Sequence, residues 1–101
     1  MKLILFAVLI LSGEGLSLVW ADVDYQARGW AATCTGCHGT EGRSIGAIPS
    51  IAGMEEKKFV QKMLYYKSDK AQATIMHQHA RGYTLDQINR MARYFRNQTS
   101  R

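Results

Sequence analysis

The segment Cys34-Thr-Gly-Cys37-His38 holds the only two cysteines of the sequence and limits, more than any other segment, which structures the chain can form. Two cysteines at this spacing, followed directly by a histidine, are the signature of covalent c-type haem attachment. Each thiol can form a thioether with one haem vinyl group, and the adjacent imidazole is then held under the iron as an axial ligand. We therefore predict one covalently bound haem c, attached to Cys34 and Cys37 and ligated by His38.

Three other uses of the cysteine pair compete with this interpretation. A thioredoxin-like redox pair belongs with a βαβ pattern, which the sequence lacks. A zinc site would need further ligands, for which His77 and His79 are the candidates. A disulfide between cysteines three residues apart would close only a tiny loop and would stabilise the fold very little. The histidine that follows directly, together with the short chain, favours haem.

The N-terminal segment, residues 1–21, is predicted to be a secretory signal peptide. Lys2 is followed by an apolar run over residues 3–11, and Val19 and Ala21 suit the −3 and −1 positions of a cleavage site. The alternative is an uncleaved membrane anchor, which Glu14 inside the apolar stretch disfavours. We expect cleavage after Ala21, a periplasmic location, and a single mature domain over residues 22–101 with no membrane span.

The size and charge of the chain narrow the function classes. Without residues 1–21 the mature domain would hold about 80 of the 101 residues, and a domain of this size buries only a little over half of its unfolded surface, so a covalent haem would supply missing core. The net charge of +5 suggests an acidic docking partner, since such charge steers encounters between redox proteins. No aromatic and basic stacking platform is present, so we expect no nucleic-acid partner.

Helical patterns predict an all-α fold of short helices wrapped around the haem. A first helix is expected over residues 24–33, and a second over residues 55–67 carries an apolar stripe. A third begins at the capping box of Thr84 and Gln87. No segment alternates as a strand would. The predicted apolar faces of the last two helices consist of Phe59, Met63 and Tyr66, widened by Val60 and Leu64, and of Ile88, Met91, Ala92 and Phe95.

A glycine-rich loop over residues 39–53 separates the haem motif from the second helix. Its isoleucines, Ile45, Ile48 and Ile51, are expected to contact the haem edge, which would be the exit for electrons. A metal-bound histidine needs an acceptor for its other ring nitrogen. We expect a backbone carbonyl near Pro49 to accept from His38 Nδ1. Trp30 lies one turn before Cys34 and is therefore expected on the same side as the haem attachment, where it is interpreted as a core residue.

The sixth iron ligand must come from elsewhere in the chain. The candidates are Met54, Met63, Met76, Met91, His77 and His79. Met63 and Met91 fall on apolar helix stripes and are interpreted as core. Met76 lies in the connection over residues 71–83, far enough beyond His38 to reach the opposite haem face. We favour Met76, and a His77 or His79 ligand or an open site remain alternatives.

Several segments beyond the haem motif together resemble class I c-type cytochromes. They are residues 44–53 (SIGAIPSIAG), 74–76 (TIM), 82–83 (GY) and 88–95 (INRMARYF). The pattern is most similar to the cytochrome c4/c553 group, and within it to the cytochrome subunit of flavocytochrome c sulfide dehydrogenase. The resemblance implies His38 and Met76 as axial ligands and the Pro49 carbonyl as the acceptor from His38.

The resemblance also implies a function and a partner. It implies a periplasmic one-electron carrier, not catalytic by itself, that accepts electrons from an FAD-containing flavoprotein oxidising sulfide and passes them to other redox proteins. A free, diffusible carrier is the alternative, and a gas-binding or peroxidatic haem protein would need an open sixth site. Two features depart from the family pattern. This chain has one haem motif where such chains often have two, and His79 stands where an aliphatic residue is usual.

Overall fold

The computed structural model describes residues 23–100, so the predicted signal peptide and its cleavage site lie outside the described residues. Over this range the chain forms four α-helices and one 3-10 turn, with no strand. They are α1 (Tyr25–His38), η1 (Thr40–Gly42), α2 (Glu56–Lys67), α3 (Met76–Arg81) and α4 (Leu85–Arg96). The all-helical prediction is confirmed for this part of the chain.

Helix α1 is longer than predicted, because it continues through the cysteine motif to His38. Asp24 caps its start, and the Asp24 side chain accepts a hydrogen bond from the Ala27 backbone N–H at 3.0 Å. Gly39 follows its last residue, with a φ of 88° that favours glycine. The predicted end at residue 33 was wrong, because Thr35 and Gly36 are poor helix formers but do not stop a helix supported by its neighbours.

The two later predicted helices are confirmed at their starts. Helix α2 begins after Glu55, as the pattern indicated. At α4 the Thr84 side chain accepts from the Gln87 backbone N–H at 3.2 Å, and the Gln87 side chain accepts from the Thr84 N–H at 2.9 Å. The short helix α3 was missed, since residues 71–83 were interpreted as a connection without helical structure.

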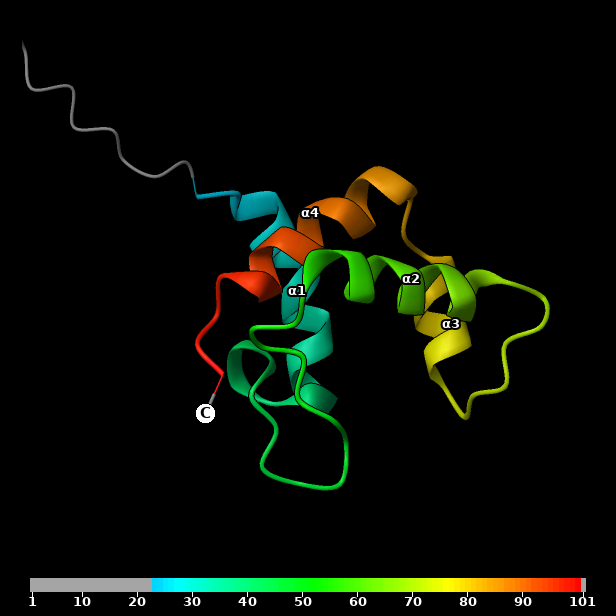
Figure 1. Cartoon of the computed structure of the whole chain (residues 1–101), viewed down its shortest axis with the longest axis horizontal. Coiled ribbons are helices and arrows are strands. Elements are labelled where there is room, and N and C mark those ends of the chain that lie inside the picture. Colours follow the sequence, from blue (N-terminus) through cyan, green and yellow to red (C-terminus); the bar gives the residue numbers. More distant parts are fainter. Residues whose placement is uncertain (1–22, 101) are drawn as a thin grey trace, which may run out of the picture.

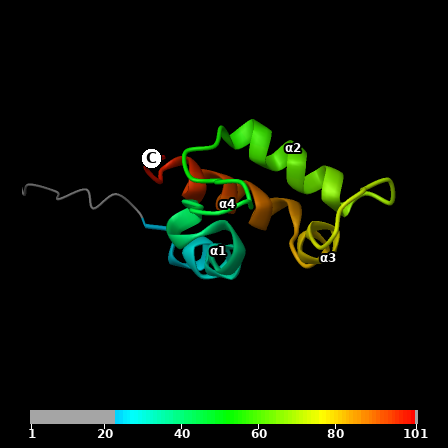
Figure 2. The ribbon, with the colours of Figure 1, turned by 90° about the horizontal axis from the view of Figure 1, so that it is seen from below.

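The helices form a small bundle in which α4 is central (Figure 1). Helices α1 and α2 both pack against α4, and α3 packs against α2. Turned by 90°, α1 is seen nearly end-on on one side of α4, with α2 on the other (Figure 2). Helices α1 and α3 lie near opposite ends of α2 in both views.

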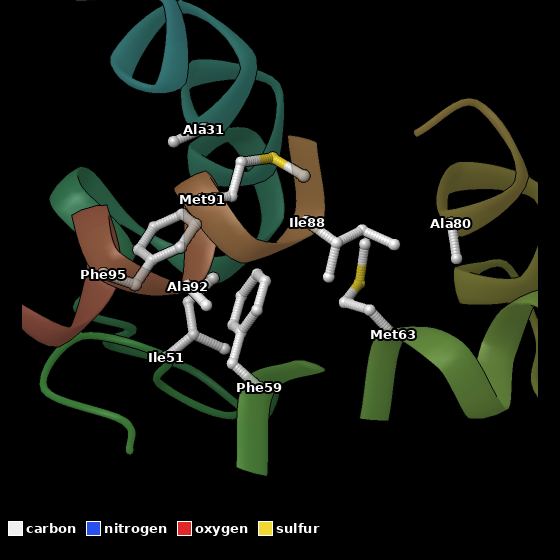
Figure 3. Packing of buried hydrophobic residues seen from close by; sticks show 9 residues of the cluster. All are labelled: Ala31, Ile51, Phe59, Met63, Ala80, Ile88, Met91, Ala92 and Phe95. Carbon is white, nitrogen blue, oxygen red and sulfur yellow. The ribbon is translucent and has the colours of Figure 1, made fainter. Parts of the chain in front are cut away.

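One cluster of buried side chains joins all four helices and the loop (Figure 3). At its centre the rings of Phe59 and Phe95 lie 5.5 Å apart, centroid to centroid, which links α2 to α4. The predicted apolar residues on α2 and α4 are buried, apart from Val60 and Tyr66, which are half-buried, and Leu64, which is 43% exposed because it lies toward the solvent edge of the stripe. The cluster consists of Ala31, Ile51, Phe59, Met63, Ala80, Ile88, Met91, Ala92 and Phe95.

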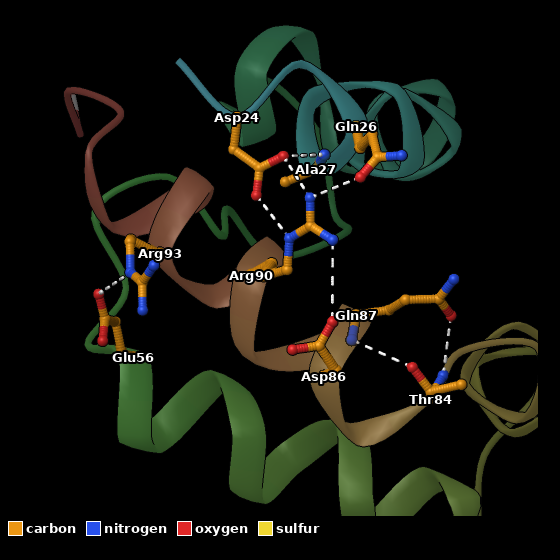
Figure 4. Close-up of polar contacts among 9 residues, drawn as sticks. All are labelled: Asp24, Gln26, Ala27, Glu56, Thr84, Asp86, Gln87, Arg90 and Arg93. Atoms are coloured by element: carbon orange, nitrogen blue, oxygen red, sulfur yellow. Dashed lines mark hydrogen bonds and ion pairs between the residues drawn. The ribbon is translucent and has the colours of Figure 1, made fainter. Parts of the chain in front are cut away.

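A polar contact also joins α1 to α4, in addition to the apolar cluster (Figure 4). Arg90 donates two hydrogen bonds to the Asp24 carboxylate, at 2.7 and 2.8 Å, and one to Gln26 Oε1 at 2.8 Å. Its guanidinium carbon also lies 4.7 Å from the ring centroid of Trp30. The residue that caps α1 is therefore held by α4, and two segments 66 residues apart are joined.

The loop is tied to the core at Gly42, which has a φ of 83° and is buried. Its carbonyl oxygen accepts from the backbone N–H groups of Ile51 and Ala52, at 2.8 and 3.1 Å. A little further on, the Gly53 N–H donates to the Phe95 carbonyl at 2.7 Å. None of the helices among residues 23–100 has the length and apolar character needed to cross a bilayer.

Candidate haem-binding site

The last turn of α1 brings both thiols and the imidazole of the motif to one wall of a cavity. Cys34, Cys37 and His38 stand at positions i, i+3 and i+4 of the helix and therefore share a face. The cavity has a volume of about 320 Å³ and is bounded by α1, the loop, α2 and α3. Its other lining residues are Thr33, Ile48, Pro49, Ile51, Met54, Phe59, Lys62, Met63, Tyr66, Thr74, Ile75, Met76, His79 and Tyr83.

His38 is oriented by the loop. Its Nδ1 atom lies 2.6 Å from the carbonyl oxygen of Pro49, so the hydrogen bond expected from the sequence is present. A carbonyl can only accept, and Nδ1 must therefore carry the proton. This tautomer leaves Nε2 with a free lone pair, which is the arrangement that a metal-binding histidine requires.

The two cysteines differ in their surroundings. Cys34 is partly buried against the core, and this burial raises the pKa of its thiol above the usual value. Cys37 is exposed. Both thiols are free, so the disulfide alternative finds no support. Among residues 23–100 no three His, Cys, Asp or Glu side chains gather in a set that could hold a metal ion, so the zinc alternative lacks a ligand set there.

The structure separates the six candidates for the sixth ligand into two groups. Met91 and His77 do not line the cavity, and Met91 is fully buried in the core, as predicted. The candidates that do line it are Met54, Met63, Met76 and His79. Met76 is the first residue of α3 and is half-buried, and α3 lies at the other end of α2 from α1. Met76 as the ligand remains a prediction.

Two of the expectations about the cavity wall were wrong. Ile48 and Ile51 line the cavity, but Ile45 does not and is fully exposed at 104%. Ser44 N–H donates to Ser50 Oγ at 2.8 Å, which pinches the loop and turns the segment between them outward. Trp30 packs against the core, as expected, but it does not reach the cavity where Cys34 lies.

Sequence reasoning missed several residues of the cavity wall. Thr33 Oγ1 lies 2.7 Å from the hydroxyl oxygen of Tyr83. The two residues are 50 apart in the sequence, so no local pattern predicts this contact. The Lys67 ammonium donates to the Tyr83 carbonyl and fixes the same segment from α2. Lys62 could have been found, because it lies three residues after Phe59 on the predicted apolar stripe of α2.

The motif, the free imidazole nitrogen and the apolar wall fit a covalently bound haem, and comparison with known proteins decides the family. The family model described as cytochrome c matches residues 27–99. The chain belongs to the cytochrome c family. Within it, the all-helical fold and the relatives below place it among the class I cytochromes c, and its cofactor is covalently bound haem c.

Two curated relatives support this cytochrome c assignment. The cytochrome subunit of sulfide dehydrogenase from Chlorobaculum tepidum is 40% identical over 65 residues, which cover 64% of this chain and 59% of the relative. Cytochrome c-552 from Acidithiobacillus ferridurans is 31% identical over 61 residues, which cover 60% of this chain and 26% of the relative. The chain thus spans less than two thirds of the length of these relatives.

Proposed function

We propose that this cytochrome transfers single electrons through a haem c attached to Cys34 and Cys37, with His38 and Met76 as axial ligands. The observation that carries the proposal is the cavity, which all four side chains line. When bound there, haem c supplies an iron that alternates between the ferrous and ferric states.

The residues of the chain set how that iron behaves. Pro49 orients His38 through the 2.6 Å hydrogen bond, so Nε2 points to a fixed position. A thioether from Met76 favours ferrous iron and raises the reduction potential relative to a second imidazole. With His38 and Met76 as its ligands, the haem iron would have no position left for oxygen or substrate, and the protein would transfer electrons without bond chemistry.

We propose further that the electron donor is a flavoprotein that oxidises sulfide and carries FAD. The support is the 40% identity to a cytochrome subunit of sulfide dehydrogenase. The net charge of +5 suits an acidic docking surface on that partner. The second candidate is a free, diffusible carrier, and its support is the 31% identity to cytochrome c-552, a relative whose name mentions no enzyme subunit. We also propose export to the periplasm, with residues 1–21 removed after Ala21, in keeping with the apolar N-terminal run.

The donor is tested by purifying the tagged holoprotein from its own host at working salt. We expect a larger, flavin-containing chain to co-purify, and sulfide to reduce the haem of the complex but not that of the separated cytochrome. A monomer that emerges alone from size exclusion, and that sulfide does not reduce when the remaining extract is added back, would support the free carrier instead.

A further inference from the structure

The apolar stripe of α2 is interrupted by one charged residue. Phe59, Met63 and Tyr66 line the cavity from this helix, and Lys62 stands among them at the same face. Phe59 and Met63 are buried, at 4% and 5% exposure, whereas Lys62 is exposed. The lysine therefore lies where the stripe meets solvent, at the rim of the cavity.

Lys62 has no anionic partner within the described chain. The ion pairs formed by residues 23–100 involve Arg43, Arg90 and Arg93, and not Lys62. Among the described residues that line the cavity there is no Asp or Glu, and Lys62 is the one Lys or Arg. A lysine thus stands beside an apolar cavity with no acidic side chain of residues 23–100 paired to it.

The cofactor of a cytochrome c carries such anions. Haem has an apolar ring and two propionate carboxylates, and burying a carboxylate without a partner is costly. A ring inside the cavity would therefore keep its carboxylates at a solvent-facing rim, where a cation favours their charged form. A charge-assisted hydrogen bond from an ammonium group is the natural contact for such a carboxylate.

We propose that Lys62 pairs with a haem propionate and thereby raises the reduction potential of the iron. The ferric haem carries one more positive charge than the ferrous haem, so a nearby cation disfavours the oxidised form. The proposal rests on haem binding in this cavity, but not on which protein donates the electron. The competing explanation is that the lysine stem covers the apolar wall while the ammonium stays in water, with no effect on the iron.

Two substitutions at this position separate charge from packing. Lys62→Met keeps a long apolar stem and removes the charge, and Lys62→Arg keeps the charge. Lys58→Met is the matched control, because Lys58 is an exposed lysine of the same helix that does not line the cavity. All three holoproteins are titrated for their midpoint potential at low ionic strength, where exposed charges are least screened.

We expect Lys62→Met to shift the reduced-to-oxidised ratio about threefold toward the oxidised form at a fixed potential, about 28 mV. Lys62→Arg should have the same midpoint potential as the wild type, and Lys58→Met should have nearly the same potential. Equal potentials for Lys62→Met and Lys58→Met would overturn the proposal. If Lys62→Met fails to take up haem, Lys62→Gln provides the same comparison. A wild-type protein without a Soret band would overturn the haem ligation as well, whereas a normal spectrum with unchanged potentials rejects the role of Lys62 alone.

Discussion

The Nδ1 atom of His38 and the carbonyl oxygen of Pro49 lie 2.6 Å apart, so the last residue of α1 is held by the loop that follows it. The contact joins two residues 11 apart in the sequence. Because proline has a restricted φ, its carbonyl is presented by a stiff piece of backbone. The loop therefore positions an imidazole whose own helix leaves it free to rotate.

The first prediction concerns this hydrogen bond in the holoprotein. The Nδ1 proton of His38 should give a resolved NMR signal that exchanges slowly with water, because a carbonyl accepts it. Pro49→Gly should speed this exchange, since glycine loosens the backbone that presents the acceptor. Gly46→Ala, in the same loop but with open space around the added methyl group, is the control and should change little. An unchanged exchange rate in Pro49→Gly would contradict the positioning role.

The second prediction concerns Met76. Met76→Ala should abolish the sulfur-to-iron charge-transfer band of the ferric protein and lower the reduction potential, because the thioether that favours ferrous iron is gone. The absorption spectrum and a redox titration provide both readings. Covalent attachment through the two cysteines should be unaffected, so the haem should remain with the polypeptide in acidified organic solvent.

The matched controls for Met76 are the other cavity-lining candidates. Met54→Leu and His79→Ala should retain the charge-transfer band, because neither side chain is needed as a ligand in this scheme. Met63→Leu keeps the volume of a buried core residue and should also retain it. A band that survives in Met76→Ala but disappears in one of these three variants would transfer the ligand role to that residue.

The third prediction concerns the contact between Asp24 and Arg90. The pKa of the Asp24 carboxyl is lowered from 3.8 to about 2. The hydrogen bonds from Arg90 make the largest contribution to this shift, and the hydrogen bond from the Ala27 N–H makes the second largest. The charged carboxylate therefore stabilises the fold fully above about pH 4. This contribution is lost as the pH falls from 3.8 toward 2, where Asp24 becomes protonated in the folded protein too.

Asp24→Asn isolates this effect, because asparagine also caps helices well but has no charge to titrate. The variant should have a lower Tm than the wild type at pH 7. Its Tm should fall less steeply than that of the wild type between pH 4 and pH 2, as followed by circular dichroism. Parallel Tm curves for the two proteins over that range would show that the Arg90 contact does not depend on the Asp24 charge.

The fourth prediction concerns Gly42, where the loop meets the core. A Cβ at this position would lie 2.8 Å from Ile51 Cγ1 and 2.9 Å from Phe95 Cδ1, and the φ of 83° disfavours any other residue. Gly42→Ala should lower the free energy of unfolding by about 2–4 kcal/mol, from backbone strain and overpacking together. Chemical denaturation of the holoprotein measures the loss. Gly46→Ala is again the control and should stay within about 0.5 kcal/mol of the wild type.

Some of these features depend on local sequence and were predictable for that reason. The cysteine spacing predicts the attachment chemistry, because two thiols and an imidazole at positions i, i+3 and i+4 share a face of any helix. The Thr84 and Gln87 capping box placed the start of α4, since its hydrogen bonds are made within four residues. The stripe of Phe59, Met63 and Tyr66 predicted which face of α2 is turned inward.

Other features were decided by contacts between distant segments. Helix α1 continues past residue 33 because the cysteine turn packs against the rest of the fold, although its own residues are poor helix formers. Helix α3 is stabilised by packing on α2. Its sequence has two histidines and no clear apolar period, so no local pattern predicts a helix there. Ile45 is apolar, as core residues are. The hydrogen bond between Ser44 and Ser50 nevertheless leaves its side chain pointing toward solvent.

Residue types and spacings of a few residues were enough to specify the cofactor and the helical class of the protein, and they predict Cys34 and Cys37 as the attachment points. The packing of the helices was needed to show which side chains share the cavity with His38, and that Lys62 lies at its rim. It also paired Asp24 with Arg90 across 66 residues. Such contacts follow from how helices pack in space, and no local pattern encodes a distance between segments that are remote along the chain.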